Sequence, residues 1–379
     1  MAGQRPAAPK ANVPSGSSFF RPHLHKLAPY KPIEPFDVLS ARLGRPAHDI
    51  VKLDANENPY GPPPEARQAL AQLEYPNIYP DPESRELRAG LAKWHGVPEE
   101  LLLAGSGADE LLDFLMRCTL EPGDRIVDCP PTFGMYAYDA EVNGATVVQV
   151  PRLEGFRIDV QGKRIKRAVE EHQPKLVFLT SPNNPDGSLI SDEDLAQVLE
   201  LPVLVVFDEA YIEFSDVPSK MSWVMERENL IVLRTFSKCA ALAGMRVGYG
   251  AFPKSMMEIL WRAKQPYNVT TASQVVAVAA MQNLEYIQDV RDKLVAERER
   301  LFKELQGVAY LDPYPSHSNF ILCRLTDGRS GAELRDRLAA EHGVMIRHYS
   351  SPGLNDCVRI SVGTPQQSRR LCEALQALA

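Results

Sequence analysis

The chain has 379 residues, of which 44% are hydrophobic and 24% charged, and its formal net charge is -7. These values are typical of a globular protein with a large core, and the negative charge argues against nucleic acid as a main partner. No apolar run approaches the roughly 20 residues that span a bilayer, so no membrane segment is expected. The six cysteines form no Cys-x-x-Cys pair and the histidines lack neighbouring ligands, which indicates free thiols and no metal site.

The first 33 residues are rich in alanine, proline and serine, and the first acidic residue is Glu34. This composition resembles the remnant of an organelle transit peptide, and a disordered or expression-derived tail is the alternative for residues 1–18. We expect residues 1–26 to form a flexible tail. Residues 27–63 are expected to form an extended arm and a short strand, 50–53, that join a smaller domain.

Residues 64–280 alternate between helical and strand patterns after two initial helices. The initial helices are expected at 64–73 and 84–95, where apolar residues recur at helical spacing. The expected strands are 101–104, 125–128, 146–150, 176–180, 203–207, 231–233 and 246–251. The expected helices between them are one that begins near 108, then 132–142, 165–172 and 192–201. This alternation predicts an α/β fold in which helices sandwich a mostly parallel, mixed sheet in one large domain.

Residues 281–379 follow a different pattern, typical of a smaller α+β domain. A helical stretch at 255–281, interrupted near 265–267, leads into this region. The expected elements of the region are a long helix at 286–306, a strand at 319–323, a helix at 331–342, strands at 344–347 and 357–362, and a last helix from 365.

One lysine occupies a position that suits a reactive amine. Lys238 follows the short apolar strand 231–233, and a lysine at the end of a buried strand can lie in a partly desolvated pocket. Desolvation favours the neutral amine, which can attack a carbonyl to form a Schiff base. Nearby, Ser237 and Arg246 can supply a hydroxyl and a fork of donors to a phosphate. An amine beside a phosphate clamp is what pyridoxal phosphate requires. Taken alone, however, this pair of features is explained more simply by a surface lysine at a turn and a solvated arginine.

Two further loops are compatible with the same cofactor. Gly107 and Ala108 lie where a strand passes into a helix, and free N–H groups at a helix start can hold a phosphate. Phe133 follows another strand end, where it could stack on a flat ring. Considered separately, these features have simpler explanations, namely a capped helix start and a core phenylalanine.

Polar residues at two more strand ends complete the pattern. Asp208 directly follows the strand 203–207, where a carboxylate could pair with a protonated pyridine nitrogen. Tyr211 and Asn184 could contact the phenolic oxygen of the same ring. Arg347 and Arg359 lie in apolar strands and need anionic partners, either in a structural salt bridge or in a bound carboxylate or phosphate.

The order of these features is shared with a known family. The stretches that carry the likeness are 53–62, 105–110, 130–136, 181–187, 208–211, 235–238 and 358–363. From about residue 27 to its end the chain resembles the fold-type-I pyridoxal-phosphate aminotransferases, and within them the histidinol-phosphate aminotransferases. The stretches 78–84 and 262–268 look most like plant and algal members, which are plastid proteins. The resemblance implies a plastid stroma location in a eukaryote and a cytoplasmic one otherwise.

The resemblance also implies a role for each candidate residue. Pyridoxal 5'-phosphate would be bound covalently by Lys238, paired with Asp208, stacked on Phe133 and contacted by Asn184 and Tyr211. Its phosphate would be held by the group Gly107, Ala108, Asp109, Ser237 and Arg246. The substrate pocket would be lined by Tyr30, Asn58, Arg347 and Arg359. Tyr79 would reach the cofactor of a neighbouring subunit, which implies a homodimer with shared active sites. Two departures from the family are Phe133 in place of tyrosine and Asp186 in place of threonine, the latter with no large consequence expected.

The implied reaction transfers an amino group between L-glutamate and imidazole acetol phosphate, giving 2-oxoglutarate and L-histidinol phosphate in histidine biosynthesis. Lys238 would act as the general base, with Asp208 and Tyr211 as its catalytic companions. A threonine-phosphate decarboxylase and an aromatic aminotransferase share this fold and remain open alternatives. A non-catalytic, cofactor-binding regulator is a third alternative, which the negative charge and the lack of a DNA-binding module disfavour.

Overall fold

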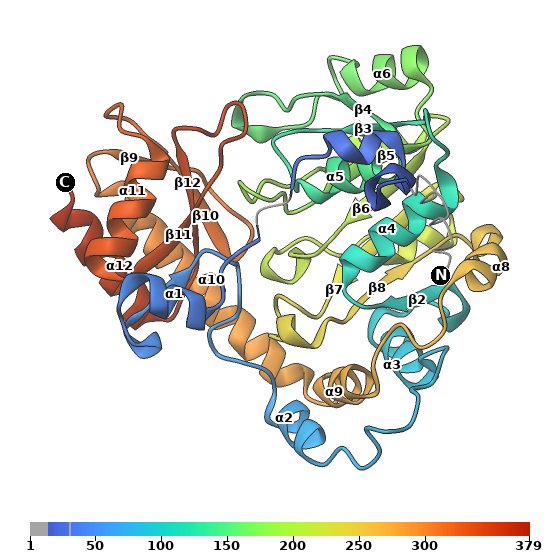
Figure 1. Cartoon of the computed structure of the whole chain (residues 1–379), viewed down its shortest axis with the longest axis horizontal. Helices are drawn as coiled ribbons and strands as arrows, with labels where there is room; N and C mark the ends of the chain where they lie inside the picture. The colour runs from blue at the N-terminus through green and yellow to red at the C-terminus, as the bar shows by residue number, and fades with distance from the viewer. Residues whose placement is uncertain (1–13, 30–31) are drawn as a thin grey trace, which may run out of the picture.

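The computed structural model describes residues 14–29 and 32–379 (Figure 1). Two sheets, one of seven strands and one of five, form the centres of a larger and a smaller region. Of the expected flexible tail, residues 1–13 lie outside the described part of the chain. The rest contains two short 3-10 helices, η1 (Gly16–Phe19) and η2 (Pro22–Lys26), and Arg21 Nη2 donates a 2.7 Å hydrogen bond to the carbonyl oxygen of Val142.

The seven-stranded sheet has the order β2-β8-β7-β6-β5-β3-β4. Its strands are β2 (Leu102–Gly105), β3 (Arg125–Asp128), β4 (Thr146–Gln149), β5 (Leu176–Thr180), β6 (Leu204–Asp208), β7 (Leu230–Thr235) and β8 (Gly248–Ala251). All neighbours are parallel except that β8 runs antiparallel to both β2 and β7. No α-helix lies between β7 and β8. Because parallel neighbours need such a crossover connection, these two strands run antiparallel. The predicted α/β fold with a mostly parallel, mixed sheet is confirmed.

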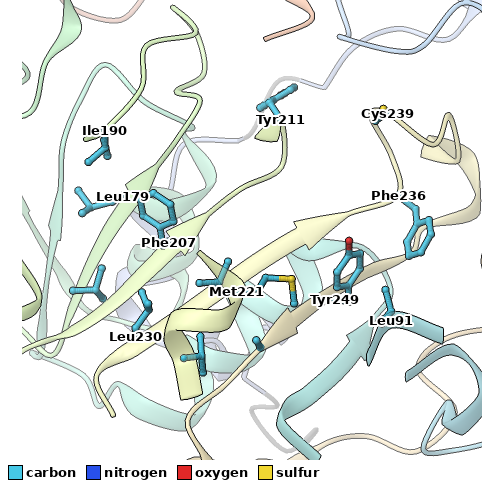
Figure 2. Close-up of a cluster of buried hydrophobic side chains, with 14 of the residues drawn as sticks. Leu91, Leu179, Ile190, Phe207, Tyr211, Met221, Leu230, Phe236, Cys239 and Tyr249 are labelled. Carbon is cyan, nitrogen blue, oxygen red and sulfur yellow. The ribbon is translucent and has the colours of Figure 1, made fainter. Parts of the chain in front are cut away.

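Helices cover both faces of this sheet. The helices of this region are α2 (Pro64–Ala71), α3 (Arg85–His95), α4 (Ala108–Thr119), α5 (Met135–Val142), α6 (Arg164–His172), α7 (Asp192–Leu199), α8 (Lys254–Ala263) and α9 (Thr271–Met281). Successive strand residues point to opposite faces, so Phe207 belongs to the buried cluster that includes residues of α7 and α9, while Val206 belongs to the one that includes residues of α4 and α5. Figure 2 shows Leu179, Phe207 and Leu230 in the first of these layers. Burial on both faces explains the nearly continuous apolar strands.

The five-stranded sheet has the order β1-β11-β12-β10-β9. Its strands are β1 (Val51–Leu53), β9 (Leu311–Pro313), β10 (Phe320–Leu325), β11 (Val344–His348) and β12 (Cys357–Ser361). The remaining α-helices among the described residues are α1 (Phe36–Leu43), α10 (Leu284–Gln306), α11 (Gly331–Arg337) and α12 (Pro365–Ala377), and the π-helical η9 (Leu338–His342) follows α11. Strand β1 pairs in parallel with β11, so the N-terminal part of the chain completes the C-terminal sheet. Helix α10 connects the two cores, because its first half packs in the larger one and Leu301 and Leu305 pack in the smaller.

The observed elements differ from the predicted ones in several places. The strand predicted at 246–251 begins at Gly248, because Arg246 has a left-handed backbone conformation with a φ of 51°. Helix α1 and strand β9 were not predicted, because α1 buries only Leu39 and β9 has only three residues at a sheet edge. The helix predicted at 132–142 begins at Met135, and the one predicted at 331–342 changes to π-helical geometry at Leu338. Among the described residues, no helix combines the length and apolar character needed to cross a membrane.

Candidate active site

A cavity of about 510 Å³ lies at the carboxyl ends of the central parallel strands. Thr180, Asp208 and Thr235 are the last residues of β5, β6 and β7, and all three line the cavity. Side chains at the carboxyl ends of parallel strands meet at one edge of the sheet, which is where α/β folds bind their ligands. Of the residues predicted from sequence, those lining the cavity are Ala108, Asp109, Phe133, Asn184, Asp208, Tyr211, Ser237, Lys238 and Arg246.

Asp208 is a buried carboxylate with two neutral hydrogen-bond donors. The hydroxyl of Tyr136 donates to Oδ2 at 2.7 Å, and the backbone N–H of Ala210 donates to Oδ1 at 2.9 Å. Burial raises the pKa of Asp208 to about 6, and the two hydrogen bonds oppose that rise. An anion in this position can pair with a protonated ring nitrogen. Tyr136 was not among the predicted site residues, although it lies in one of the stretches that carry the family likeness.

Lys238 lies beside a tyrosine that a distant loop holds in place. Its Nζ lies 5.5 Å from the ring centroid of Tyr211, and the Tyr211 hydroxyl accepts a 3.0 Å hydrogen bond from Asn56 Nδ2. Tyr211 and Cys239 follow the ends of β6 and β7 in Figure 2. Asn56, which lies just after β1, was not among the predicted site residues. The amine therefore has an aromatic neighbour whose hydroxyl is already oriented.

The start of α4 forms an anion cradle. The helix begins at Ala108 after Gly107, which has a φ of 84°, and the first N–H groups of a helix lack partners within it. Arg246 donates from Nη2 to Asp109 Oδ2 at 2.9 Å and from Nη1 to Ser237 Oγ at 3.5 Å. A Cβ on Gly107 would lie only 2.4 Å from Arg246 Nη2, so glycine leaves the space that the guanidinium occupies. The set of donors fits a phosphate group.

A flat ring fits the space next to this cradle. Phe133 lines the cavity and meets the ring of Tyr136 edge-on, with centroids 5.6 Å apart and an interplanar angle of 84°. Ala210 also lines the cavity and offers a small side chain. An aromatic face, a buried carboxylate, an amine and an anion cradle together match the chemical groups of pyridoxal phosphate.

The turn that carries Asn184 depends on a buried acid. Asp186 is 1% exposed, accepts a hydrogen bond from Asn183 Nδ2, and accepts another at 2.8 Å from the N–H of Ser188. Burial raises the pKa of this carboxyl. Asn183 in turn accepts a 2.9 Å hydrogen bond from Thr132 Oγ1, so the turn is fastened to the loop that presents the stacking ring. No large consequence was expected of Asp186, but in the structure its carboxylate closes this turn.

Arg359 is a buried cation without a described carboxylate among its hydrogen-bond acceptors. It lies on β12, where Nη1 donates to Asn184 Oδ1 at 2.6 Å and Nη2 donates to the carbonyl oxygen of Asp54 at 2.8 Å. Its Nε lacks a hydrogen-bond partner within the part of the chain that the structure describes. Arg347 on β11 is its cross-strand neighbour. A buried guanidinium whose acceptors are neutral needs an anion. Arg359 itself is not a lining residue, but its acceptor Asn184 lines the cavity.

Among the predicted site residues that the structure describes, those that do not line the cavity are Gly107, Arg347, Arg359, Asn58 and Tyr79. Asn58 donates a 2.8 Å hydrogen bond to the carbonyl oxygen of Cys239 and so supports the loop that carries Lys238 from outside the cavity. Tyr79 is 78% exposed and stacks on Tyr267, with centroids 4.6 Å apart. Tyr30 lies outside the described residues. The cavity also gains lining residues that no local motif identified, namely Ile33, Glu34, Pro35, Phe36 and Lys52.

Fold and site together define a pyridoxal-phosphate-dependent transaminase. The family described as Aminotransferase class I and II matches residues 48–375. The chain is 61% identical over 362 residues to the chloroplastic histidinol-phosphate aminotransferase of Nicotiana plumbaginifolia, covering 96% of this chain and 87% of that protein. It is 46% identical to the histidinol-phosphate aminotransferase of Roseiflexus castenholzii, with 96% and 99% covered. The chain belongs to the class I and II aminotransferases, within the histidinol-phosphate aminotransferase family.

Solved structures agree with this assignment. The histidinol-phosphate aminotransferase of Sinorhizobium meliloti in complex with pyridoxal-5'-phosphate matches with a TM-score of 0.85 and 29% identity, covering 96% of this chain and 99% of that one. The L-threonine-O-3-phosphate decarboxylase of Porphyromonas gingivalis matches with a TM-score of 0.77 and 23% identity, covering 87% of this chain and 99% of that one. At that identity the second likeness shows a common fold alone.

Proposed function

We propose that this chain catalyses the reversible transfer of an amino group between L-glutamate and imidazole acetol phosphate, yielding 2-oxoglutarate and L-histidinol phosphate. The observation that carries the proposal is the cavity in which Lys238, Asp208 and Arg246 converge. The 61% identical relative supports the choice of substrate. This reaction is a step of histidine biosynthesis.

Each residue of the cavity has a proposed task toward the cofactor. When bound, pyridoxal phosphate supplies an aldehyde that condenses with amines and a pyridinium ring that accepts electrons. Asp208 keeps the ring nitrogen protonated, and Phe133 covers one ring face. Asn184 and Tyr211 contact the phenolic oxygen. The phosphate is held by Gly107, Ala108, Asp109, Ser237 and Arg246.

Lys238 has two tasks in this proposal. Its Nζ would anchor the cofactor between turnovers. Once displaced by the amino group of the substrate, it would take the proton from the substrate Cα and pass it to the aldehyde carbon of the cofactor, and in the second half-reaction it would move a proton in the opposite direction. The 5.5 Å separation between Nζ and the Tyr211 ring keeps the amine beside the aromatic wall of the cavity. Tyr211 and Asp208 assist by holding the ring that faces this amine.

Arg359, with Arg347 beside it, is proposed to bind the anionic group that the two substrates have in common. Glutamate has an α-carboxylate where histidinol phosphate has a phosphate ester, and a planar fork of donors suits either group. One cationic site therefore serves both half-reactions. Asn58 and Tyr30 are proposed to complete this substrate pocket, Asn58 through its contact with the Cys239 carbonyl.

Replacement of Arg359 with alanine tests this shared site. We expect kcat/KM to fall on the order of 10- to 100-fold for both glutamate and histidinol phosphate, because hydrogen bonds to a charged partner are lost in each case. Steady-state kinetics with each substrate measures the effect. Arg359→Lys is the matched control, which retains the charge but loses the fork and should recover only part of the rate. Unchanged kinetics with either substrate would show that the anions bind elsewhere.

We also propose that the protein is a homodimer in which Tyr79 reaches the cofactor phosphate of the other subunit. Tyr79, Ile78, Tyr75 and Tyr267 are exposed aromatic and apolar side chains that lie close together in the chain or stack on one another. Burial against a second copy would remove this surface from water.

A subunit-mixing experiment tests the shared site. Tyr79→Ala should bind the cofactor more weakly, and Lys238→Ala should be inactive. When the two are mixed and allowed to exchange subunits, each mixed dimer has one site with both native residues, so the mixture should turn over faster than the sum of the separate variants. Sedimentation measures the dimer, and a glutamate assay measures the rescue. No gain on mixing would argue against Tyr79 acting across the interface.

The location and domain limits are also proposals. The 61% identical Nicotiana relative is chloroplastic, and an acid-poor N-terminal segment suits a plastid protein. We propose a tail at 1–26, an arm and strand at 27–63, a large cofactor-binding domain at 64–280 and a small domain at 281–379. The pairing of β1 with β11 supports the assignment of the arm to the smaller sheet.

One assay tests the reaction itself. Purified protein with pyridoxal phosphate is incubated with histidinol phosphate and 2-oxoglutarate, and the expected product is glutamate. Parallel incubations with threonine phosphate and with an aromatic amino acid serve as comparisons. Carbon dioxide release from threonine phosphate without glutamate formation would favour the lyase, and turnover of the aromatic amino acid alone would favour the aromatic aminotransferase.

A further inference from the structure

We propose that Tyr136 is a positioning residue that sets the orientation and charge of Asp208 toward the cofactor's ring nitrogen. The inference rests on the proposed role of Asp208. It concerns a hydroxyl in the wall of the cavity that has no task in the reaction described above.

Burial and ring contacts hold the Tyr136 hydroxyl in one position. Tyr136 is 0% exposed and lies in the first turn of α5, and its hydroxyl donates to Asp208 Oδ2 at 2.7 Å. Its ring stacks on Phe178 with centroids 5.1 Å apart at 15°, and meets Phe133 edge-on. Phe178 lies on β5, whose neighbour β6 ends in Asp208. The donor is therefore held by aromatic contacts with the same sheet that presents the acceptor.

The surroundings of Asp208 give this hydrogen bond a large effect. The carboxylate is buried, and both of its described donors, Tyr136 and the N–H of Ala210, are uncharged. Among the groups that lower the pKa of Asp208 against the effect of burial, Tyr136 is the largest, while Asp109 raises it and Lys238 lowers it. Without the hydroxyl, Asp208 would take up a proton more readily, and the ring nitrogen would lose its anion.

Tyr136 itself remains a donor across the working pH range. Burial and the neighbouring carboxylates of Asp208 and Asp128 raise the pKa of its hydroxyl well above the ordinary value. The proton therefore stays on the tyrosine, and the pair behaves as a neutral donor bound to a carboxylate. A neutral donor orients an anion without cancelling the charge that the ring nitrogen requires.

The decisive variant is Tyr136→Phe, which removes the hydroxyl and keeps the ring. When the cofactor is bound to this variant, we expect the pKa obtained by titrating the visible absorbance of the cofactor to rise by about one unit. A lost hydrogen bond to a charged group produces a shift of this size. The direction is upward because a less protonated ring nitrogen withdraws less electron density from the titrating imine. One pKa unit is equivalent in free energy to a factor of 10 in a rate constant, so we expect kcat to fall about 10-fold. The KM for glutamate should be nearly unchanged.

Tyr249→Phe is the matched control. Tyr249 is buried at 1% exposure, and its hydroxyl hydrogen-bonds with His95 Nε2 at 2.9 Å outside the cavity. This change removes an equally buried hydroxyl, so it reproduces any general loss of stability. The absorbance titration and kcat of this control should match those of the wild type.

Two further measurements separate positioning from a purely structural role. In an Asp208→Asn background, Tyr136→Phe should cause no additional loss of kcat, because the residue acts through Asp208. A ring-fluorinated tyrosine at position 136, whose more acidic hydroxyl is a stronger donor, should shift the absorbance pKa downward. If Tyr136→Phe folds poorly, the variant with fluorinated tyrosine still tests the proposal.

Clear results would overturn the inference. An absorbance titration and kcat of Tyr136→Phe that equal those of the wild type would do so, as would a full additional loss in the Asp208→Asn background. A wild-type protein that binds the cofactor but makes no glutamate from histidinol phosphate and 2-oxoglutarate would instead contradict the proposed function. The two failures are therefore distinguishable in the same set of experiments.

Discussion

Replacement of Lys238 with alanine is expected to reduce turnover by at least about 10³-fold and to abolish covalent attachment of the cofactor. Lys238 supplies both the anchoring amine and the base that moves the Cα proton, and a positioned base alone contributes 10²- to 10⁴-fold. Borohydride reduction of the holoprotein followed by peptide mass spectrometry measures the attachment. The glutamate assay measures the turnover.

Lys52 provides a control for this experiment, because it is the other lysine among the described residues that line the cavity. Its Nζ is 3.1 Å from Asp54 and 2.8 Å from Glu57, so its amine is engaged as an ammonium in ion pairs. Lys52→Ala should therefore keep the borohydride-fixed cofactor at position 238. Label at Lys52, or unchanged turnover in Lys238→Ala, would refute the assignment on which the proposed chemistry depends.

Asp208→Asn is expected to lower kcat on the order of 10²- to 10³-fold, the effect of removing a preorganised group that stabilises developing charge. The amide keeps nearly the same volume but has no charge to hold the ring nitrogen protonated. The retained cofactor should also dissociate more readily. Steady-state kinetics and a fluorescence titration of cofactor binding measure the two effects. A variant with wild-type kcat would exclude the carboxylate as the partner of the ring nitrogen.

The same substitution should have the opposite effect on the cofactor-free protein. Burial raises the pKa of Asp208 from 3.8 to about 6. The folded protein then binds the proton more tightly than the unfolded chain, so ionised Asp208 opposes folding above pH 6, and the penalty fades as the pH falls toward 4. At pH values above this window Asp208→Asn should stabilise the apoprotein by at most about 3 kcal/mol. Urea denaturation on both sides of the window measures the difference, which should shrink in acid.

A loss of activity combined with a gain of apoprotein stability would be a specific signature. Charge buried for catalysis costs folding free energy until the cofactor arrives. A structural aspartate would lose stability on the same replacement. The sign of the stability change at neutral pH therefore distinguishes a functional carboxylate from a structural one.

Local signals in the sequence were sufficient for the fold class and for the residues at the strand ends. Asn184, Asp208 and Lys238 each follow an apolar run, and the carboxyl ends of parallel strands meet at one edge, so their convergence could be predicted without coordinates. The glycines at the start of α4 were also predictable, because close backbone approach has few alternatives. These inferences depend on interactions within short stretches of chain.

The partners that tune those residues were decided by tertiary structure. Tyr136 and Asp208 are 72 positions apart, Asn56 and Tyr211 are 155 apart, and Arg359 and Asn184 are 175 apart. Which aromatic side chain of 130–136 faces the carboxylate depends on the rotation of α5, and the helix starts at Met135 rather than at 132. No periodicity encodes that rotation, because it results from packing against β5. The local sequence was enough to assign the groups that lie at the sheet edge. The donors that contact these groups depend on how the helices and β12 pack, because those contacts join segments that share no local pattern.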